Sequence, residues 1–226
     1  MKRPFPLCIP RLATAVVSFA LAEPSVLCAQ TTPRWSVETP TGPSRTLSFE
    51  VSEGTLMNLA VSPDGRSIAF DLLGSIYEIP IGGGTAKRLT SGRSWNLAPQ
   101  YSPDGRSIAF SSDRAGSFDV WTLDRQSGAL ERITTARLSA SENYYRPSWS
   151  SDGRRIYATA STDGAPNEVV ALDRLGSRQV LLKGYDILGG VSAESDGVNL
   201  YLEKGGAPLY SFEFNPYVTP PSGVRI

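Results

Sequence analysis

The regular spacing of certain aspartates in this chain could indicate a ligand-binding or catalytic role. An Asp-Gly pair recurs at intervals of 40, 48 and 44 residues, beginning at Asp64, Asp104, Asp152 and Asp196. Carboxylate oxygens are preferred ligands of calcium, so calcium binding is one chemistry that this pattern allows. Calcium takes six or more oxygen ligands, however, and single carboxylates that lie a whole repeat apart do not supply them. The neighbouring residues favour a structural role.

The residues around these aspartates predict a hairpin turn in every repeat. Residues 62–70 and 102–110 are both SPDGRSIAF, and the later copies are SSDG and ESDG. Proline presets φ for the second position of a type I turn, aspartate suits the third, and glycine takes the left-handed position that follows. We therefore expect a three-residue hairpin loop with a G1-type bulge. The predicted turn residues are Asp64, Gly65, Asp104, Gly105, Asp152, Gly153, Asp196 and Gly197.

The composition excludes most catalytic sites. The chain has no histidine, which excludes a histidine-based zinc site, a Ser-His-Asp triad and an imidazole general base. No G-x-S-x-G motif occurs, and residues 82–84 (GGG) lie between expected strands, where a hairpin turn explains them better than a phosphate loop. No spacing singles out a pair of carboxylates. We expect no enzymatic activity, no cofactor and no metal, and the formal net charge of zero does not suggest a nucleic-acid partner.

A few residues outside the turns are candidates for contact with a partner. Aromatic and arginine side chains in loops between repeats suit a binding hot spot. Each candidate also has a structural explanation, because an Asp-Arg pair forms an ion pair or a turn, and rings in such loops cap the core between repeats. The candidates are Trp95, Asp113, Arg114, Tyr144, Tyr145 and Arg146.

Short strands must position these residues. Apolar side chains alternate with small ones, as Ile68 and Phe70 do, and no stretch after residue 29 has a sustained helical period. Four strands every 40–48 residues are typical of β-propeller blades. We therefore predict an all-β propeller of four-stranded antiparallel blades, with four blades recognisable and the last one incomplete. The strands expected after the turns span 67–70, 75–81, 87–90, 107–110, 118–124, 131–134, 155–160, 167–173, 178–182, 199–203 and 208–214.

The two ends of the chain are expected to lie outside the blades. Residues 1–29 combine a basic start, an uncharged apolar run at 12–22 and a small-residue exit, which is the pattern of a secretory signal peptide. The run is too short to span a bilayer, and Leu27 before Cys28 argues against a lipoprotein. Cleavage would remove both cysteines. The predicted division is a signal peptide at 1–29, an extended lead-in at 30–45, blades at 46–214 and an irregular tail at 215–226.

The repeat resembles a known family. Residues 102–124, SPDGRSIAFSSDRAGSFDVWTLD, resemble the WD40-like (PD40) repeats of TolB-type β-propellers, over about residues 46–214. Residues 49–92 are similar to the N-terminal propeller of exported bacterial proteins in which a TolB-like domain precedes a metal-dependent amidohydrolase domain. Those propellers generally have six or more blades. The resemblance therefore implies a shortened propeller, because prolines follow residue 214 where a further strand is expected.

Two functions of different classes follow. The first is a non-catalytic exported binding module, periplasmic or secreted, that presents a loop face to a protein or peptide partner in the cell envelope. The second is a truncated N-terminal propeller of an amidohydrolase, whose histidine ligands have no counterpart here. In either function no segment spans a membrane after signal cleavage, and an open last blade invites self-association.

The signal-like segment generates a prediction about the mature N-terminus. If residues 1–29 direct export, the mature protein begins near Gln30 or Thr31. N-terminal sequencing of protein from an envelope fraction should show the loss of these residues. An intact Met1 on protein recovered from the cytosol would contradict the prediction.

Overall fold

The computed structural model describes residues 57–136, 141–175, 177–185, 187–193, 199–204 and 207–213, with several positions between 36 and 54. The chain divides into two units, Met1–Arg34 and Trp35–Ile226, and every described residue belongs to the second. The predicted signal peptide, the tail at 215–226, and the turn residues Asp196 and Gly197 lie outside the described residues.

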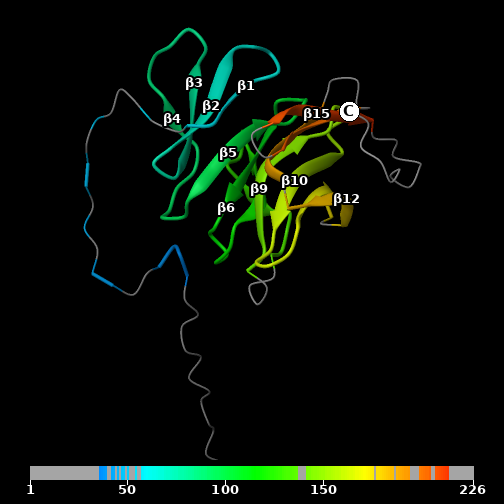
Figure 1. The fold of residues 1–226 in the computed structure, drawn as a ribbon. Helices are drawn as coiled ribbons and strands as arrows, with labels where there is room; N and C mark the ends of the chain where they lie inside the picture. The colour runs from blue at the N-terminus through cyan, green and yellow to red at the C-terminus, as the bar shows by residue number, and fades with distance from the viewer. Residues whose placement is uncertain are drawn as a thin grey trace, which may run out of the picture. The chain divides into compact units, whose positions relative to one another are not determined.

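The described residues form four antiparallel sheets and contain no helix that is long and apolar enough to cross a membrane (Figure 1). Three sheets have four consecutive strands each, and the fourth has three, so each sheet is one blade. Blade 1 has β1 (Leu59–Val61), β2 (Ser67–Leu72), β3 (Ser75–Pro80) and β4 (Lys87–Arg88); blade 2 has β5 (Asn96–Tyr101), β6 (Ser107–Ser112), β7 (Asp119–Asp124) and β8 (Leu130–Arg132). Blade 3 has β9 (Asn143–Trp149), β10 (Arg155–Ser161), β11 (Asn167–Asp173) and β12 (Arg178–Gly184); blade 4 has β13 (Ile187–Ala193), β14 (Asn199–Lys204) and β15 (Ala207–Glu213).

This architecture confirms the prediction of an all-β propeller built from antiparallel blades, with the fourth blade incomplete in the part that the structure describes. The strands differ from the expected ranges mainly at the outer edge, where β4 and β8 have two and three residues. A side chain continues the pairing there. The Thr90 hydroxyl accepts the Ile76 N–H, and the Thr134 hydroxyl accepts the Val120 N–H, both at 2.9 Å. In both blades a threonine hydroxyl thus takes the place of a backbone carbonyl as the acceptor of a strand N–H.

The hairpin turn of blade 1 is held by a serine as well as by its aspartate. The Ser62 hydroxyl donates to Asp64 Oδ1 at 2.6 Å, and the same oxygen accepts the Arg66 N–H at 3.1 Å. Ser62 Oγ also accepts the Ser67 N–H at 2.9 Å, while Gly65 has a φ of 69°. These bonds, with the Ser62 hydroxyl first among them, hold the pKa of the Asp64 carboxyl below its usual range. The turns of blades 2 and 3 repeat the same bonds.

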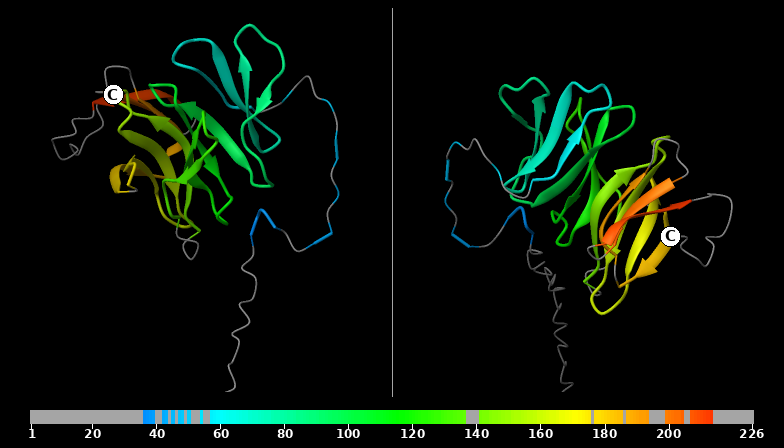
Figure 2. Two further views of the ribbon diagram at one scale, coloured as in Figure 1. Left: turned by 180° about the vertical axis from the view of Figure 1, so that it is seen from behind. Right: turned by 45° about the horizontal axis from the view of Figure 1, so that its top comes forward.

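The blades follow one another as separate sheets (Figure 2), and the core lies between them rather than within one. Where blade 1 meets blade 2, and where blade 2 meets blade 3, smaller side chains of the earlier blade pack on larger ones of the later blade. A blade therefore buries its apolar side chains against its neighbours. The first contact joins Ala60, Ala69 and Ile76 of blade 1 to Tyr101, Ile108, Phe110 and Leu123 of blade 2; the second joins Ala109, Val120 and Ile133 of blade 2 to Trp149, Ile156 and Leu172 of blade 3; and the third joins Tyr157, Val169, Ala171 and Leu181 of blade 3 to Ile187 and Val191 of blade 4.

Polar contacts join the same pairs of blades. The Tyr101 hydroxyl of blade 2 donates to Glu78 Oε1 of blade 1 at 2.7 Å, and the Arg125 guanidinium pairs with the same carboxylate. Burial raises the pKa of the Tyr101 hydroxyl, so it remains a donor at neutral pH. Between blades 2 and 3, Trp149 Nε1 donates to the Gln100 carbonyl at 3.2 Å. These bonds satisfy polar groups that blade packing removes from water.

The left-handed glycine of the turn generates a stability prediction. Gly105 has a φ of 69°, and an added Cβ would meet Pro63 Cδ only at ordinary contact distance, 3.6 Å. Gly105→Ala should therefore lower the free energy of unfolding by about 1–2 kcal/mol through backbone strain alone. Gly82→Ala is the matched control, because Gly82 lies in a turn with open space around it and no positive φ. Urea unfolding should show the loss for Gly105→Ala, and an equal cost at both positions would contradict the explanation.

Candidate functional site

The candidate site lies where the inner strands of the blades begin. The inner strands are β1, β5, β9 and β13, and successive ones contact each other. The pairing of β5, β9 and β13 with the next strand is interrupted by a register shift in each blade. In two of these bulges a non-glycine residue adopts a left-handed conformation, Ala98 with a φ of 54° and Arg146 with a φ of 50°. A proline comes directly after each of these residues, Pro99 and Pro147, and a bulge is one of the few places in a strand that tolerate proline.

One buried carboxylate joins blade 1 to the bulge of blade 2. Asp71, at 3% exposure, accepts the Ala98 N–H at 2.7 Å through Oδ2. Its two oxygens also accept the Asn58 backbone N–H at 2.9 Å and the Asn58 side-chain amide at 2.8 Å. Sequence analysis did not single out Asp71. The sequence did contain a signal for this residue. The equivalent positions in blades 2 and 3 are Ser111 and Thr159, so among these three blades only blade 1 has a charged residue there.

A pocket of about 330 Å³ opens beside these bulges. Its lining includes Asn58 of blade 1, Leu97 and Ser111 of blade 2, and Tyr145 and Arg146 of blade 3. Ser111 is 1% exposed, and its hydroxyl has no hydrogen-bond partner among the described residues. A buried hydroxyl without a partner is costly, and Ser111 belongs to the lining of this pocket. The pocket combines an aromatic ring, a guanidinium, an amide and a hydroxyl.

Tyr145 and Arg146 are the predicted binding residues that the structure places in this pocket. Both line the pocket, and Tyr145 packs its ring on Phe118 with 5.3 Å between the centroids. Burial raises the pKa of the Tyr145 hydroxyl. The side chain of Arg146 also packs tightly on blade 4, because a Cβ built on Gly190 would lie 3.1 Å from Arg146 Cβ. Their role in binding remains a prediction.

Trp95, Asp113 and Arg114 form a separate group on blade 2. Asp113 Oδ1 accepts the Trp95 N–H at 2.7 Å, and the Trp95 side chain is 51% exposed. The Arg114 guanidinium donates to Asn96 Oδ1 at 3.0 Å and lies 5.0 Å from the ring centroid of Trp121. Burial lowers the pKa of Arg114. Asp113 and Arg114 thus hold their own loop in place, while Trp95 presents an exposed ring.

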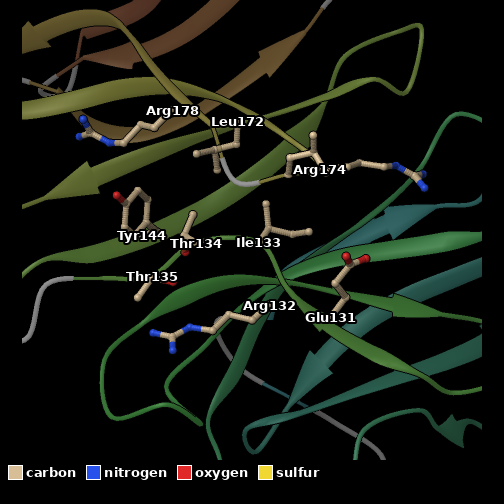
Figure 3. Close-up of a pocket in the computed structure, with 10 residues that line it drawn as sticks. Glu131, Arg132, Ile133, Thr134, Thr135, Tyr144, Leu172, Arg174 and Arg178 are labelled. Carbon is tan, nitrogen blue, oxygen red and sulfur yellow. The ribbon is translucent and has the colours of Figure 1, made fainter.

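Tyr144 is placed apart from its neighbour Tyr145. It is 3% exposed and lines a second pocket of about 470 Å³ between blades 2 and 3, with Arg132, Arg174 and Arg178 (Figure 3). In this view the guanidinium group of Arg174 points away from those of Arg132 and Arg178. The latter two are already paired, Arg132 with the buried Asp119 and Arg178 with Glu168. Burial raises the pKa of the Tyr144 hydroxyl. This pocket therefore lacks a convergent set of donors.

The described residues hold no group of metal ligands beside these pockets. In the part of the chain that the structure describes, no three Cys, His, Asp or Glu side chains are grouped closely enough to hold a metal ion. In each hairpin turn of blades 1–3, one carboxylate oxygen of the aspartate accepts hydrogen bonds from the serine hydroxyl of the same turn and from a backbone N–H. The arrangement can recognise a ligand by shape and hydrogen bonding.

Comparison with known proteins identifies the class and then the family. Consecutive four-stranded antiparallel blades, packed through their faces around converging inner strands, define a β-propeller. A family model described as the TolB beta propeller domain (PD40) matches residues 31–187. The chain belongs to this TolB β-propeller family.

Individual relatives match parts of longer proteins. An uncharacterized protein, Atu1656, of Agrobacterium fabrum strain C58 is 42% identical over 77 residues, which are 32% of this chain and 26% of that protein. The uncharacterized peptidase YuxL of Bacillus subtilis strain 168 is 34% identical over 87 residues, 38% of this chain and 12% of that protein. The crystal structure of TolB from Acinetobacter baumannii has 25% sequence identity and a TM-score of 0.61, over 71% of this chain and 41% of that chain. This chain thus matches less than half the length of each.

The two adjacent tyrosines generate a matched prediction. Tyr144 is almost fully buried and packs in the core between blades 2 and 3, so Tyr144→Ala should lower the free energy of unfolding by about 3–5 kcal/mol. Tyr145 is partly exposed at the pocket, so Tyr145→Ala should cost roughly half as much or less. Urea unfolding of both variants measures the difference. Equal destabilisation would mean that Tyr145 is a core residue and not a residue free to bind.

Proposed function

We propose that this chain is a non-catalytic, exported β-propeller that binds a protein or peptide segment in the cell envelope at the pocket beside the inner-strand bulges. The observation that carries the proposal is the buried Ser111 hydroxyl, which has no partner among the described residues and lies in a pocket with Tyr145 and Arg146. Tyrosine and arginine are enriched among residues that dominate binding energy. The signal-like residues 1–29 support export.

The size of the pocket limits what can enter it. A volume of about 330 Å³ is at the lower end of the range for ligand sites. It suits one or two side chains of an extended segment, with the remainder of the partner lying on the surrounding loops. Trp95, whose ring is 51% exposed, is the candidate for such an outer contact. The partner would therefore donate or accept a hydrogen bond at Ser111 and place a ring or an acidic group near Tyr145 and Arg146.

Composition supports a binding role over catalysis. The chain has no histidine, and the pocket residues named here include no carboxylate or thiol that could act as base or nucleophile. Fold alone does not decide this point, because the same architecture carries different functions in different proteins. The proposal therefore rests on the pocket residues.

A second candidate is a propeller that accompanies a catalytic domain, either the amidohydrolase domain expected from residues 49–92 or another hydrolase. The match to the Bacillus subtilis peptidase, which involves 12% of that protein, favours this candidate. In that case the propeller would position substrate for chemistry done elsewhere. Reading the genomic DNA beyond codon 226 distinguishes the two, since a metal motif or a catalytic serine motif in the same frame would favour the second.

Binding at the pocket is tested with a phage-displayed random peptide library as the probe. Peptides selected on the full chain should bind about tenfold more weakly to Arg146→Ala, because they lose a charge-assisted contact. Ser111→Ala should weaken them by about two- to tenfold, which is the loss of one hydrogen bond. Arg66→Ala is the control, because Arg66 is an exposed arginine in the hairpin turn of blade 1 and does not line the pocket.

The outcomes of this selection are distinct. Peptides that bind Arg146→Ala and Arg66→Ala equally well would show that the pocket is not the site. A library that yields no peptide with measurable affinity for the wild-type chain would contradict the binding proposal itself. Unfolding curves for each variant show whether a loss of binding reflects a loss of folded protein.

A further inference from the structure

The loop that joins blade 1 to blade 2 binds a carboxylate from outside the blades. Glu38, a residue of the lead-in, accepts the Arg93 backbone N–H at 2.7 Å through Oε2 and the Ser94 N–H at 3.3 Å through Oε1. Partial burial acts to raise the pKa of this carboxyl, but the hydrogen bonds from Arg93 and Ser94 and the charge of Arg114 outweigh it and lower the pKa. The carboxylate is therefore ionised at neutral pH, and two successive backbone amides stabilise its charge.

The shape of the loop suits this carboxylate. A Cβ built on Gly92 would lie 2.7 Å from Glu38 Oε1 and closer still to Oε2, so a side chain at this position would exclude the bound oxygens. The buried Asn96 amide holds the loop in place, because it donates to the Ser94 carbonyl at 2.9 Å and to the Gly74 carbonyl at 2.8 Å. Glu38 takes part in neither bond. We therefore expect the loop to keep its shape when the carboxylate leaves.

Blade 2 supplies a carboxylate of its own at the equivalent place. The buried Asp119 accepts the Ala136 N–H at 2.8 Å and the Thr134 hydroxyl at 2.7 Å. The equivalent strand residue of blade 1 is Ser75, since Ser75 and Asp119 each precede the residue whose N–H donates to a threonine hydroxyl. Blade 1 therefore has no carboxylate at this strand position. The one that its loop binds comes from 55 residues earlier in the chain and is not fixed by a strand of the blade.

The surroundings of the loop suit an acidic segment of a partner. Arg114 is close enough to act on the bound charge, Arg88 donates to a carbonyl of the same loop at 3.4 Å, and Arg93 belongs to the loop. The one carboxylate beside them, Asp113, accepts the Trp95 N–H at 2.7 Å, so positive charge is in excess. The Trp95 side chain is 51% exposed, and tryptophan and arginine are enriched among residues that dominate binding energy.

We propose that residues 91–95 and Arg114 form a binding site for an acidic side chain of a partner protein, and that Glu38 occupies this site until such a side chain replaces it. A tethered carboxylate competes at an effective concentration of about a millimolar or more, so the partner must add further contacts. The exposed ring of Trp95 is the residue that offers one. The site shares no residue with the lining of the pocket beside the inner-strand bulges, so this contact does not depend on that pocket.

Amide chemical shifts of the ¹⁵N-labelled full chain test the proposal. The variant Glu38→Gln should move the Arg93 and Ser94 amide protons upfield, because both lose a charged acceptor. The probe is a synthetic peptide of residues 33–43 with both ends blocked, which carries the same glutamate. It should return these two amides toward their wild-type positions. Its affinity for Glu38→Gln should be about tenfold higher than for the wild type, in which the tethered carboxylate competes.

Two controls isolate the carboxylate and the space that it fills. The same peptide with glutamine in place of its glutamate should bind Glu38→Gln about tenfold more weakly. Adding Gly92→Ala to the Glu38→Gln chain should abolish binding, since the new Cβ takes the place of the oxygens. Gly83→Ala is the matched control: its φ of 87° is close to the 96° of Gly92, and nothing lies within 4 Å of an added Cβ. It introduces a similar backbone strain and should leave binding unchanged.

Three results would overturn the proposal. The first is an unchanged pair of Arg93 and Ser94 amide shifts in Glu38→Gln, which would mean that Glu38 does not occupy the loop. The second is a peptide that fails to bind Glu38→Gln, or that binds it no more tightly than the wild type. The third is equal binding by the Gly92→Ala and Gly83→Ala chains, because the peptide would then lie elsewhere on the protein.

Discussion

Burial of one blade against the next is the interaction on which this structure depends. A four-stranded sheet has two faces, and a single blade has nothing within itself to cover either of them. The chain solves this by packing the face of one blade on the face of the next, as Ala69 and Phe110 show where blade 1 meets blade 2. The stability of each blade is therefore shared with its neighbours, as in other repeat proteins.

The same packing determines where polar groups must be satisfied. In blades 1–3, hairpin turns close one end of the blade with a local set of bonds between serine, aspartate and backbone. At the other end the inner strands bulge, and blade 1 uses the buried carboxylate of Asp71 to satisfy the Ala98 N–H of blade 2. Ser111 occupies the equivalent position one blade later and has no such neighbour among the described residues. Ser111 lines the pocket described above.

The proposed binding function depends on such differences between blades rather than on the repeat. The repeated residues build turns and cores, which every propeller needs whether or not it is an enzyme. The residues that occur in one blade and not in the next, such as Tyr145 and Arg146, are the ones that can distinguish a partner. The comparisons agree with this view, since this chain matches parts of both a TolB and an uncharacterized peptidase.

The sequence by itself determined the class of fold. Period-2 patterning and an Asp-Gly turn every 40–48 residues are local features, and reading them requires no knowledge of contacts distant in the sequence. It also identified Tyr145 and Arg146 as candidates, although it could not separate them from Tyr144. Only the tertiary structure decided that Tyr144 is buried between blades while Tyr145 lines a pocket, because neighbouring residues of a strand point to opposite sides. The role of Asp71 was also hidden, since its partners lie 13 and 27 residues away and meet it only when blades pack.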